Sequence, residues 1–161
     1  MAGVLRVARP RPSWGFTLPE MLLAAALAAL LASLALPSLG EALIRVRRAE
    51  AVTALGALQL AQENRRAQAA AYTTDLAALG LAQAFTVSGA YHLSVPEASE
   101  HGYTLLARRA PHARGPADER CDVLALRANG GRLALASACA GCELPAAEAA
   151  AADPHRCWAS P

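Results

Sequence analysis

The stretch that decides the fold reads Gly15-Phe16-Thr17-Leu18-Pro19-Glu20 and continues from residue 21 to residue 40 as MLLAAALAALLASLALPSLG. These last residues carry no charge, and as a helix they would rise about 30 Å, the thickness of the hydrocarbon core of a bilayer. A cleavable secretory signal is a weaker interpretation, because its apolar region has only about 7 to 15 residues. The stretch therefore predicts a helix that lies in a membrane.

Composition limits the classes of protein to which the chain can belong. Its 161 residues suffice for one domain of ordinary size, and 42 of them are Ala, so the core must be modest. The net charge is +2, with 15 basic residues that are all Arg, which is not typical of a polybasic nucleic-acid domain. Aromatic residues make up 4% of the chain, too few for an array of base-stacking platforms.

The motif at residues 15–20 resembles the type IV pilin family, including its minor pilins and the related type II secretion pseudopilins. In that family a short basic leader ends in Gly, a prepilin peptidase cleaves after it, and the new N-terminal residue, usually Phe, is N-methylated. The resemblance assigns cleavage to Gly15 and Phe16 and N-methylation to Phe16, so that residues 1–15 are a leader peptide. The family also has a glutamate at the fifth position of the mature chain and a helix-kinking proline at the twenty-second. These positions correspond to Glu20 and Pro37.

The resemblance gives Glu20 a partner and gives the chain a topology. It pairs the Glu20 carboxylate with the Phe16 amine of a neighbouring subunit, which would offset two charges buried among packed helices. It makes residues 16–40 a transmembrane and polymerisation helix, kinked at Pro37, and residues 41–161 a periplasmic globular domain. The protein would thus cross the inner membrane once and become extracellular when assembled in a pilus.

The helix should continue beyond the membrane. From Glu41 to about Ala71 there is no Pro and a single Gly, among many good helix formers. One apolar face follows a spacing of three and four residues and predicts the buried stripe Ala51, Leu55, Leu58 and Gln62. This globular domain therefore includes the outer half of the long helix.

The remainder of the chain predicts a small sheet. Residues 72–81 indicate a helical turn with Thr74 as its cap and Gly80 as its stop, in a segment that also resembles PilE-like minor pilins. Alternating patterns predict four strands, at residues 91–95, 103–108, 122–127 and 132–136. The last two flank Ala128-Asn129-Gly130-Gly131, where Asn-Gly favours a tight hairpin. The expected fold is α+β, a pilin fold with the long helix packed on a four-stranded antiparallel sheet.

Four cysteines lie in the last quarter of the chain, at positions 121, 139, 142 and 157. An even number predicts disulfides in an oxidising compartment, and the spacing alone leaves all three pairings open. The resemblance to PilE-like pilins implies a bond from Cys121 to Cys157, beside Trp158, that staples the C-terminal tail to the sheet. Cys139 and Cys142 would then pair locally.

Two other uses of these cysteines are less favoured. Cys139-Ala140-Gly141-Cys142 resembles a thioredoxin-type pair, but neither the helix N-terminus nor the βαβ context of that chemistry is visible. Zinc binding would need a second knuckle with ligand spacing, so no metal is expected. The four histidines form no triad pattern, no phosphate-binding loop follows a strand, and no cofactor is expected. We therefore expect a protein that is not an enzyme.

Residues 146–152, mostly Ala, predict a mobile or helical insertion in the tail.

The resemblance implies a structural, PilE-like minor pilin of a type IV pilus that acts in pilus biogenesis and thereby in adhesion, twitching motility or DNA uptake. Its partners would be the prepilin peptidase and N-methyltransferase, other pilin subunits, the pilus assembly platform and the inner membrane. A type II secretion pseudopilin is a lesser alternative, because the C-terminal cysteines are not the usual ending of that group.

A DNA-binding minor pilin for natural transformation is the other alternative. Its candidate contacts are four arginines around one predicted loop, Arg108, Arg109, Arg114 and Arg120. Asp118, Glu119 and Asp122 lie in the same stretch, which favours a solvated loop of mixed charge over a DNA-binding surface. A few arginines on the phosphate backbone would give weak and strongly salt-dependent binding.

Overall fold

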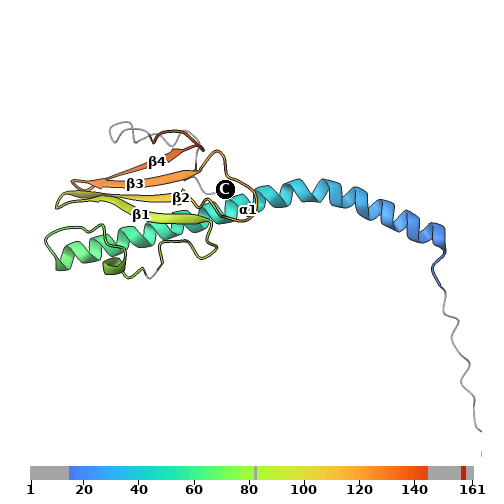
Figure 1. Ribbon diagram of the computed structural model, residues 1–161, viewed down its shortest axis with the longest axis horizontal. Helices are drawn as coiled ribbons and strands as arrows, with labels where there is room; N and C mark the ends of the chain where they lie inside the picture. The colour runs from blue at the N-terminus through green and yellow to red at the C-terminus, as the bar shows by residue number, and fades with distance from the viewer. Residues whose placement is uncertain (1–14, 82, 145–156, 159–161) are drawn as a thin grey trace, which may run out of the picture. The chain divides into compact units, whose positions relative to one another are not determined.

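A computed structural model of the protein describes residues 15–81, 83–144, 157 and 158, with residues 34–38 described as backbone only. Its elements are the helix α1 (Leu18–Gln68), the 3-10 helix η1 (Ala77–Leu79) and the strands β1 (Tyr91–Ala98), β2 (Gly102–Arg109), β3 (Val123–Asn129) and β4 (Arg132–Ala138) (Figure 1). The expected α+β class is confirmed. By its internal contacts the chain divides into two compact units, Met1–Ser38 and Leu39–Pro161.

The start of α1 is capped by its own sequence. The backbone N–H of Thr17 donates to Oε2 of Glu20 at 3.4 Å, and the N–H of Met21 donates to the carbonyl of Thr17 at 3.1 Å. A glutamate that accepts from the amide of the cap residue three positions earlier is half of a capping box. Pro19 fits in this first turn, because an amide at its position would have no intrahelical partner.

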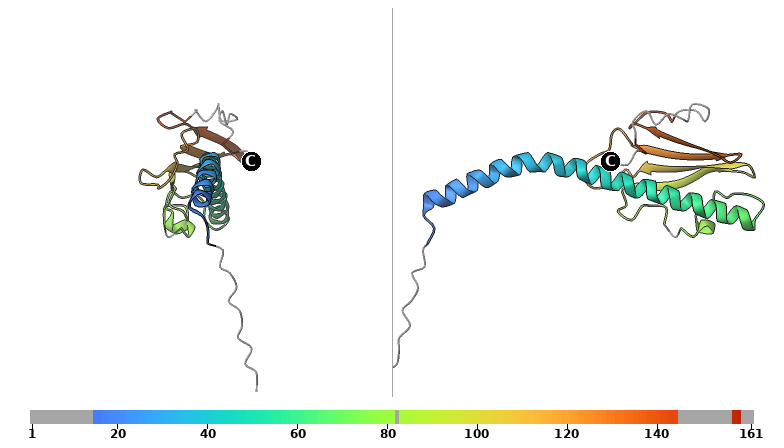
Figure 2. Two further views of the ribbon diagram at one scale, coloured as in Figure 1. Left: turned by 90° about the vertical axis from the view of Figure 1, so that its right-hand side faces the viewer. Right: turned by 180° about the vertical axis from the view of Figure 1, so that it is seen from behind.

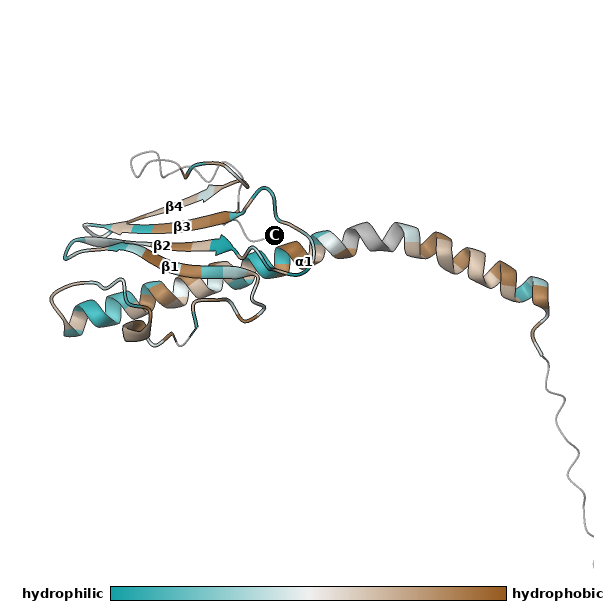
Figure 3. Ribbon diagram, in the orientation of Figure 1, coloured by the Kyte–Doolittle hydropathy of each residue, from teal (hydrophilic) through white to brown (hydrophobic). Residues whose placement is uncertain are grey.

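The apolar side chains that are described in the first unit are exposed. The large ones are Met21, Leu22, Leu23, Leu27, Leu30 and Leu31. The hydropathy colouring shows that this part of α1 is mostly apolar (Figure 3). Among the helical residues whose side chains are described, none forms a segment with the length and apolar character of a membrane span. The side chain of Pro37, where the sequence predicts a kink, lies outside the described part of the chain.

In the second unit, α1 runs along one face of the sheet (Figure 2). The predicted stripe Ala51, Leu55, Leu58 and Gln62 is confirmed, since all four residues are fully buried. They belong to a core with the inward-facing residues of the strands, among them Leu93, Leu105, Leu124 and Leu126. The helix ends at Gln68 rather than near Ala71, because the chain turns away to let the amide of Tyr72 donate to the carbonyl of Ser99 at 3.2 Å.

The four strands form one antiparallel meander in the order β1-β2-β3-β4, as predicted. The register places Leu105 of β2 opposite Leu126 of β3, so that both side chains face α1. Strand β1 extends three residues beyond its predicted end, through Pro96, with a bulge between Ser94 and Glu97. A proline is tolerated there because β1 is an edge strand, which has no ladder partner on its outer side at that position.

The β3–β4 hairpin is confirmed, but its central residues differ from the prediction. Asn129 is the last residue of β3 and pairs with Arg132, so the turn consists of Gly130 and Gly131. Their φ angles are +55° and +78°. Two consecutive positive φ angles are those of the two-residue turn that matches strand twist, and glycine adopts both without a steric penalty.

The segment between α1 and β1 is fixed by a buried glutamine. The side-chain amide of Gln62 donates to the carbonyl of Thr73 at 2.6 Å and accepts from the N–H of Thr73 at 3.1 Å. The predicted cap at Thr74 is wrong, because η1 begins after Leu76 and Asp75 accepts from the amide of Ala77 at 2.9 Å. Gly80 ends η1 with a φ of +82°, as predicted.

Both outer strands carry additional hydrogen bonds along their free edges. On β1, the amide of Leu93 donates to the carbonyl of Ala84 at 2.7 Å, and the amide of Thr86 donates to the carbonyl of Tyr91 at 2.9 Å. On β4, the indole N–H of Trp158 donates to the carbonyl of Ala136 at 2.8 Å.

Two disulfides connect the four cysteines, Cys121 with Cys157 and Cys139 with Cys142. The first joins the beginning of β3 to the C-terminal residues, with a Cα–Cα distance of 5.8 Å. This is the pairing that the resemblance implied, and it gives the fold its stapled tail. The Ala-rich residues 146–152 lie outside the described residues.

Candidate nucleic-acid interface

Asp118 anchors the loop between β2 and β3 to the helix. Its Oδ2 accepts from Nε of Arg48 at 2.8 Å, and its Oδ1 accepts from Nη2 of the same guanidinium at 2.9 Å. Oδ1 also accepts from the backbone N–H of Cys121 at 3.2 Å. A carboxylate held by both arms of a guanidinium has little orientational freedom. The loop is therefore fixed against α1 at a defined position.

Tyr91 supports this anchor from the core. Its hydroxyl donates to the carbonyl of Cys121 at 3.1 Å, and its side chain is buried. Burial raises the pKa of Tyr91 far above its ordinary value, and the nearby Asp118 carboxylate raises it further. The hydroxyl thus remains a neutral donor at any physiological pH, and the turn from Asp118 to Cys121 is held on two sides.

Residues 113–115 of the loop lie against two further arginines. The guanidinium of Arg47 packs on Gly115, where an added Cβ would lie 2.8 Å from Nη1. Gly115 also has a φ of +89°, so the position requires glycine for two reasons. From the other side, Nη2 of Arg109 lies 3.4 Å from the carbonyl oxygens of Ala113 and Gly115. These long contacts leave most of the charge of Arg109 uncompensated.

A groove of about 410 Å³ separates the helix from the later part of the loop. It is lined by Glu41, Ile44, Arg45, Arg48, Ala117, Asp118, Glu119 and Arg120. Arg45 and Arg120 are exposed, one on each wall, and neither makes a side-chain hydrogen bond or ion pair within the described residues. Glu41 and Glu119 lower the positive potential of the groove, although within the described part of the chain neither forms an ion pair with these arginines.

The fold brings some of the predicted arginines together and separates others. Arg109 ends β2, and Arg114 and Arg120 lie in the loop that follows it. Arg109 and Arg120 each line a hollow against the start of the outer half of α1. Arg108 follows the strand alternation, stands opposite His92 and points to the other face of the sheet from Arg109. Sequence reasoning missed Arg45 and Arg47 as members of this surface, because no local pattern connects residues 45–48 to a loop 70 residues later.

We name the resulting surface the helix–loop arginine cluster and define it as Arg45, Arg47, Arg109, Arg114 and Arg120. Arg48 is excluded, because Asp118 neutralises it. Arg45 and Arg47 lie on α1, Arg109 lies at the end of β2, and Arg114 and Arg120 lie in the β2–β3 loop. The cluster can bind an anionic surface such as a phosphate backbone through several separate charges.

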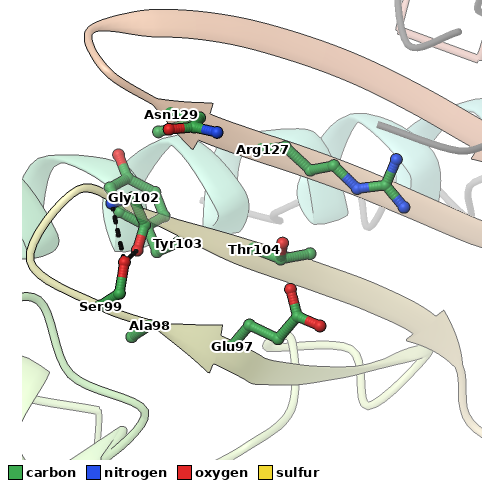
Figure 4. A pocket seen from close by; sticks show the side chains of 9 residues that line it. Glu97, Ala98, Ser99, Gly102, Tyr103, Thr104, Arg127 and Asn129 are labelled. Carbon is green, nitrogen blue, oxygen red and sulfur yellow. Dashed lines mark hydrogen bonds between the residues drawn. The ribbon is translucent and has the colours of Figure 1, made fainter. Parts of the chain in front are cut away.

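A second groove, of about 460 Å³, lies at the other end of the sheet, beside the β1–β2 turn (Figure 4). The register aligns Glu97, Thr104 and Arg127 in one row across three strands. Ser99 closes the turn by accepting from the amide of Gly102 at 3.2 Å. Gly102 has no room for a side chain, since a Cβ would lie 2.1 Å from the carbonyl oxygen of Ala128. This groove carries one residue of each charge, Glu97 and Arg127, whereas three arginines line the first groove.

The remaining predicted site residues lie in the first unit or in the disulfides. Gly15 and Phe16 precede α1, and the side chain of Phe16 is 76% exposed. Glu20 faces Thr17 of its own chain, as described above. All four cysteines are oxidised, so none supplies a free thiolate to zinc or to redox catalysis, and the described residues include no group of three metal-ligating side chains.

Comparison with known families identifies a minor-pilin family. The family model described as "Type IV minor pilin ComP, DNA uptake sequence receptor" matches residues 37–125, more than half of the chain. Comparison with curated proteins gives no match. The matched range contains the outer part of α1, the first two strands and the whole β2–β3 loop. With its fold and its N-terminal motif, the chain belongs to the type IV minor pilin ComP family.

Proposed function

We propose that this minor pilin binds duplex DNA through the helix–loop arginine cluster and acts in DNA uptake. The observation that carries the proposal is the placement of Arg45 and Arg120 on the two walls of one groove, with Arg114 in the same β2–β3 loop. All three arginines are exposed and have no ion-pair partner among the described residues. The family description names a DNA uptake sequence receptor, and the match covers every member of the cluster. Both facts support a DNA-binding role over the solvated loop that composition favoured.

The charge is local rather than general. From residue 41 onward the chain has 12 Arg and 12 Asp or Glu, so its net side-chain charge there is zero. Attraction to DNA must therefore come from the arrangement of charges, and the ion pair of Arg48 with Asp118 contributes by fixing that arrangement. A few phosphate contacts give weak binding, whose affinity falls with salt in proportion to the number of contacts. Arg108, on the other sheet face, is a candidate for a further contact at the end of β2.

The proposal includes the structural role of a pilus subunit. Cleavage after Gly15 and methylation of Phe16 by the prepilin peptidase would produce the mature N-terminus, and Glu20 would pair with the Phe16 amine of a neighbouring subunit. Residues 16–40 would cross the inner membrane once and pack with other pilins through the assembly platform. The Cys121–Cys157 bond would support the domain in the periplasm and outside the cell. The family match favours this role over a type II secretion pseudopilin and over an enzyme.

The test is a titration of the full-length protein in detergent with duplex DNA at several salt concentrations. Each phosphate contact contributes about 0.9 to the slope of log affinity against log salt. The variant Arg45→Ala/Arg114→Ala/Arg120→Ala should therefore lose up to about 2.7 from that slope and bind much more weakly at low salt. No DNA binding by the parent at low salt, or an unchanged slope in the triple variant, would contradict the proposal.

A matched pair of single variants separates the local effect from a general loss of charge. Arg120→Ala removes one charge from the cluster, and Arg132→Ala removes one exposed charge from the β3–β4 hairpin. The two positions lie at opposite ends of β3, about 20 Å apart for a strand of seven residues. Arg120→Ala should lower the affinity and Arg132→Ala should leave it nearly unchanged. Equal losses would place the DNA elsewhere.

A further inference from the structure

The two disulfides differ sharply in their exposure to solvent. Cys121 and Cys157 are 0% and 1% exposed and belong to the hydrophobic core. Cys142 is exposed and Cys139 is half-buried, at the end of β4. Thiol–disulfide exchange requires the attacking thiolate to reach a sulfur atom along the S–S axis, so access decides which bond reacts. Only the second bond offers that access in the folded protein.

The chain around Cys139 and Cys142 forms a small and open turn. The amide of Cys142 donates to the carbonyl of Cys139 at 3.0 Å, and Gly141 has a φ of +75°. The two enclosed residues are Ala140 and Gly141, so no side chain larger than a methyl group stands within the ring. A reagent can therefore approach the Cys142 sulfur without displacing any part of the core.

We propose that Cys139–Cys142 is a thiol–disulfide exchange site that is reduced by a dithiol while Cys121–Cys157 stays oxidised. One thiolate of the dithiol attacks Sγ of Cys142, forming a mixed disulfide and releasing Cys139 as a thiolate that takes up a proton. The second thiolate of the dithiol then attacks the first sulfur of the dithiol, which is bonded to Cys142 in the mixed disulfide. Cys142 leaves as a thiolate and is protonated. Two electrons and two protons pass to the protein, and the dithiol becomes a disulfide.

The position of this pair makes it a substrate of exchange rather than a catalyst. Cys139 directly follows β4 and lies at the start of no helix among the described residues. A catalytic Cys-x-x-Cys pair depends on a helix N-terminus that stabilises its thiolate. Without it, the pair accepts electrons from a stronger thiol nucleophile and does not pass them on.

Opening this bond has a defined consequence for the β2–β3 loop. The amide of Ala140, inside the ring, donates to the carbonyl of Glu119 at 2.9 Å. Glu119 lies between Asp118, which is held by Arg48, and Arg120, which belongs to the arginine cluster. The closed ring keeps the Ala140 amide in place for this bond. Reduction releases that constraint. The hydrogen bond between Ala140 and Glu119 therefore couples the oxidation state of the disulfide to the β2–β3 loop.

The test uses the full-length protein in detergent, titrated with dithiothreitol, quenched with N-ethylmaleimide and mapped by mass spectrometry. Cys139 and Cys142 should both be alkylated at dithiothreitol concentrations at least tenfold below those that open Cys121–Cys157. The control Cys139→Ser/Cys142→Ser should take up no label over that lower range. Simultaneous opening of both bonds, or earlier labelling of Cys121, would overturn the proposal.

Two further measurements test the direction of attack and the link to the loop. Brief treatment with glutathione, a monothiol, should leave the mixed disulfide mainly on Cys142, and a majority on Cys139 would contradict attack at the exposed sulfur. Hydrogen exchange after selective reduction should show faster exchange of the Ala140 amide, with no change at Leu105 or Leu126. Unchanged exchange at Ala140 would contradict the link to Glu119.

Discussion

Arg48 and Asp118, seventy residues apart in the sequence, form an ion pair with two nearly parallel hydrogen bonds that joins α1 to the β2–β3 loop. The side chains are 21% and 9% exposed, so the pair is shielded from most of the solvent. Pairs of this kind position the elements that they join, whereas exposed pairs contribute little to stability. This pair, which lies outside the arginine cluster, is therefore one of the contacts that set the position of the cluster.

Removing either partner of this pair should destabilise the second unit. Arg48→Met or Asp118→Asn leaves a mostly buried group without its partner and should cost about 2 to 4 kcal/mol in free energy of unfolding. The double variant Arg48→Met/Asp118→Leu should lose less than the sum of the single variants, because it leaves no unpaired charge. Urea titrations followed by circular dichroism measure these differences. Arg45→Met, an exposed neighbour on α1, should change stability by less than about 0.5 kcal/mol.

Stability should decline at high pH because of two buried tyrosines. Burial raises the pKa of Tyr91 and Tyr103 above the ordinary value of 10.0, with a further contribution at Tyr103 from its hydrogen bond to Glu63. Above pH 10 the unfolded chain releases these protons while the folded chain keeps them. The unfolded state then binds fewer protons, so the free energy of unfolding falls as the pH rises. Below pH 10 the contribution is fully present.

The expected slope is up to about 1.4 kcal/mol per pH unit for each tyrosine. Tyr91→Phe and Tyr103→Phe should each flatten the decline, in denaturation curves recorded at closely spaced pH values above 9. The near-ultraviolet absorbance of tyrosinate should show late ionisation in the folded parent. If the free energy of unfolding falls with the same slope in the double Phe variant, groups other than these two tyrosines cause the loss of stability.

The proposed N-terminal processing has its own test. Mass spectrometry of protein recovered from cells should show a mature N-terminus at methylated Phe16, and an intact leader would contradict the assignment. Glu20→Ala should leave membrane association intact and reduce incorporation into pili, because it removes the proposed partner of the Phe16 amine. Glu41→Ala removes an exposed carboxylate further along α1 and serves as the control. Equal incorporation of the two variants would argue against the pairing.

Local patterns in the sequence were sufficient for most of the fold. The buried stripe from Ala51 to Gln62 follows helical spacing and β2 follows alternation, so each was predicted within a few residues. Strand β4 was also located, although its burial does not alternate and Leu133 and Leu135 are exposed. The hairpin was recognised from its glycines, although the turn is shifted by one residue. These features depend on neighbours in sequence, which periodicity describes well.

The contacts that organise the candidate site could not be read in the same way. The pairing of Arg48 with Asp118 and the packing of Arg47 on Gly115 depend on where a loop returns after two strands. The sequence presented Asp118 as a negative charge that opposes DNA binding, whereas in the structure it neutralises Arg48 and fixes the loop. A count of charges treats each residue as independent. It does not reveal that the Asp118 carboxylate is paired with Arg48.

The hydrogen bonds along the two outer strands have a consequence for assembly. A free strand edge is a template on which another chain can add a strand, and such addition leads to uncontrolled aggregation. Here Ala84 and Thr86 form hydrogen bonds with the backbone of β1, and the indole of Trp158 donates a hydrogen bond to the carbonyl of Ala136 on β4. Sheets of neighbouring subunits are thereby discouraged from fusing when pilins are crowded in one filament. Contact between subunits is then left to surfaces other than the edges of the sheet.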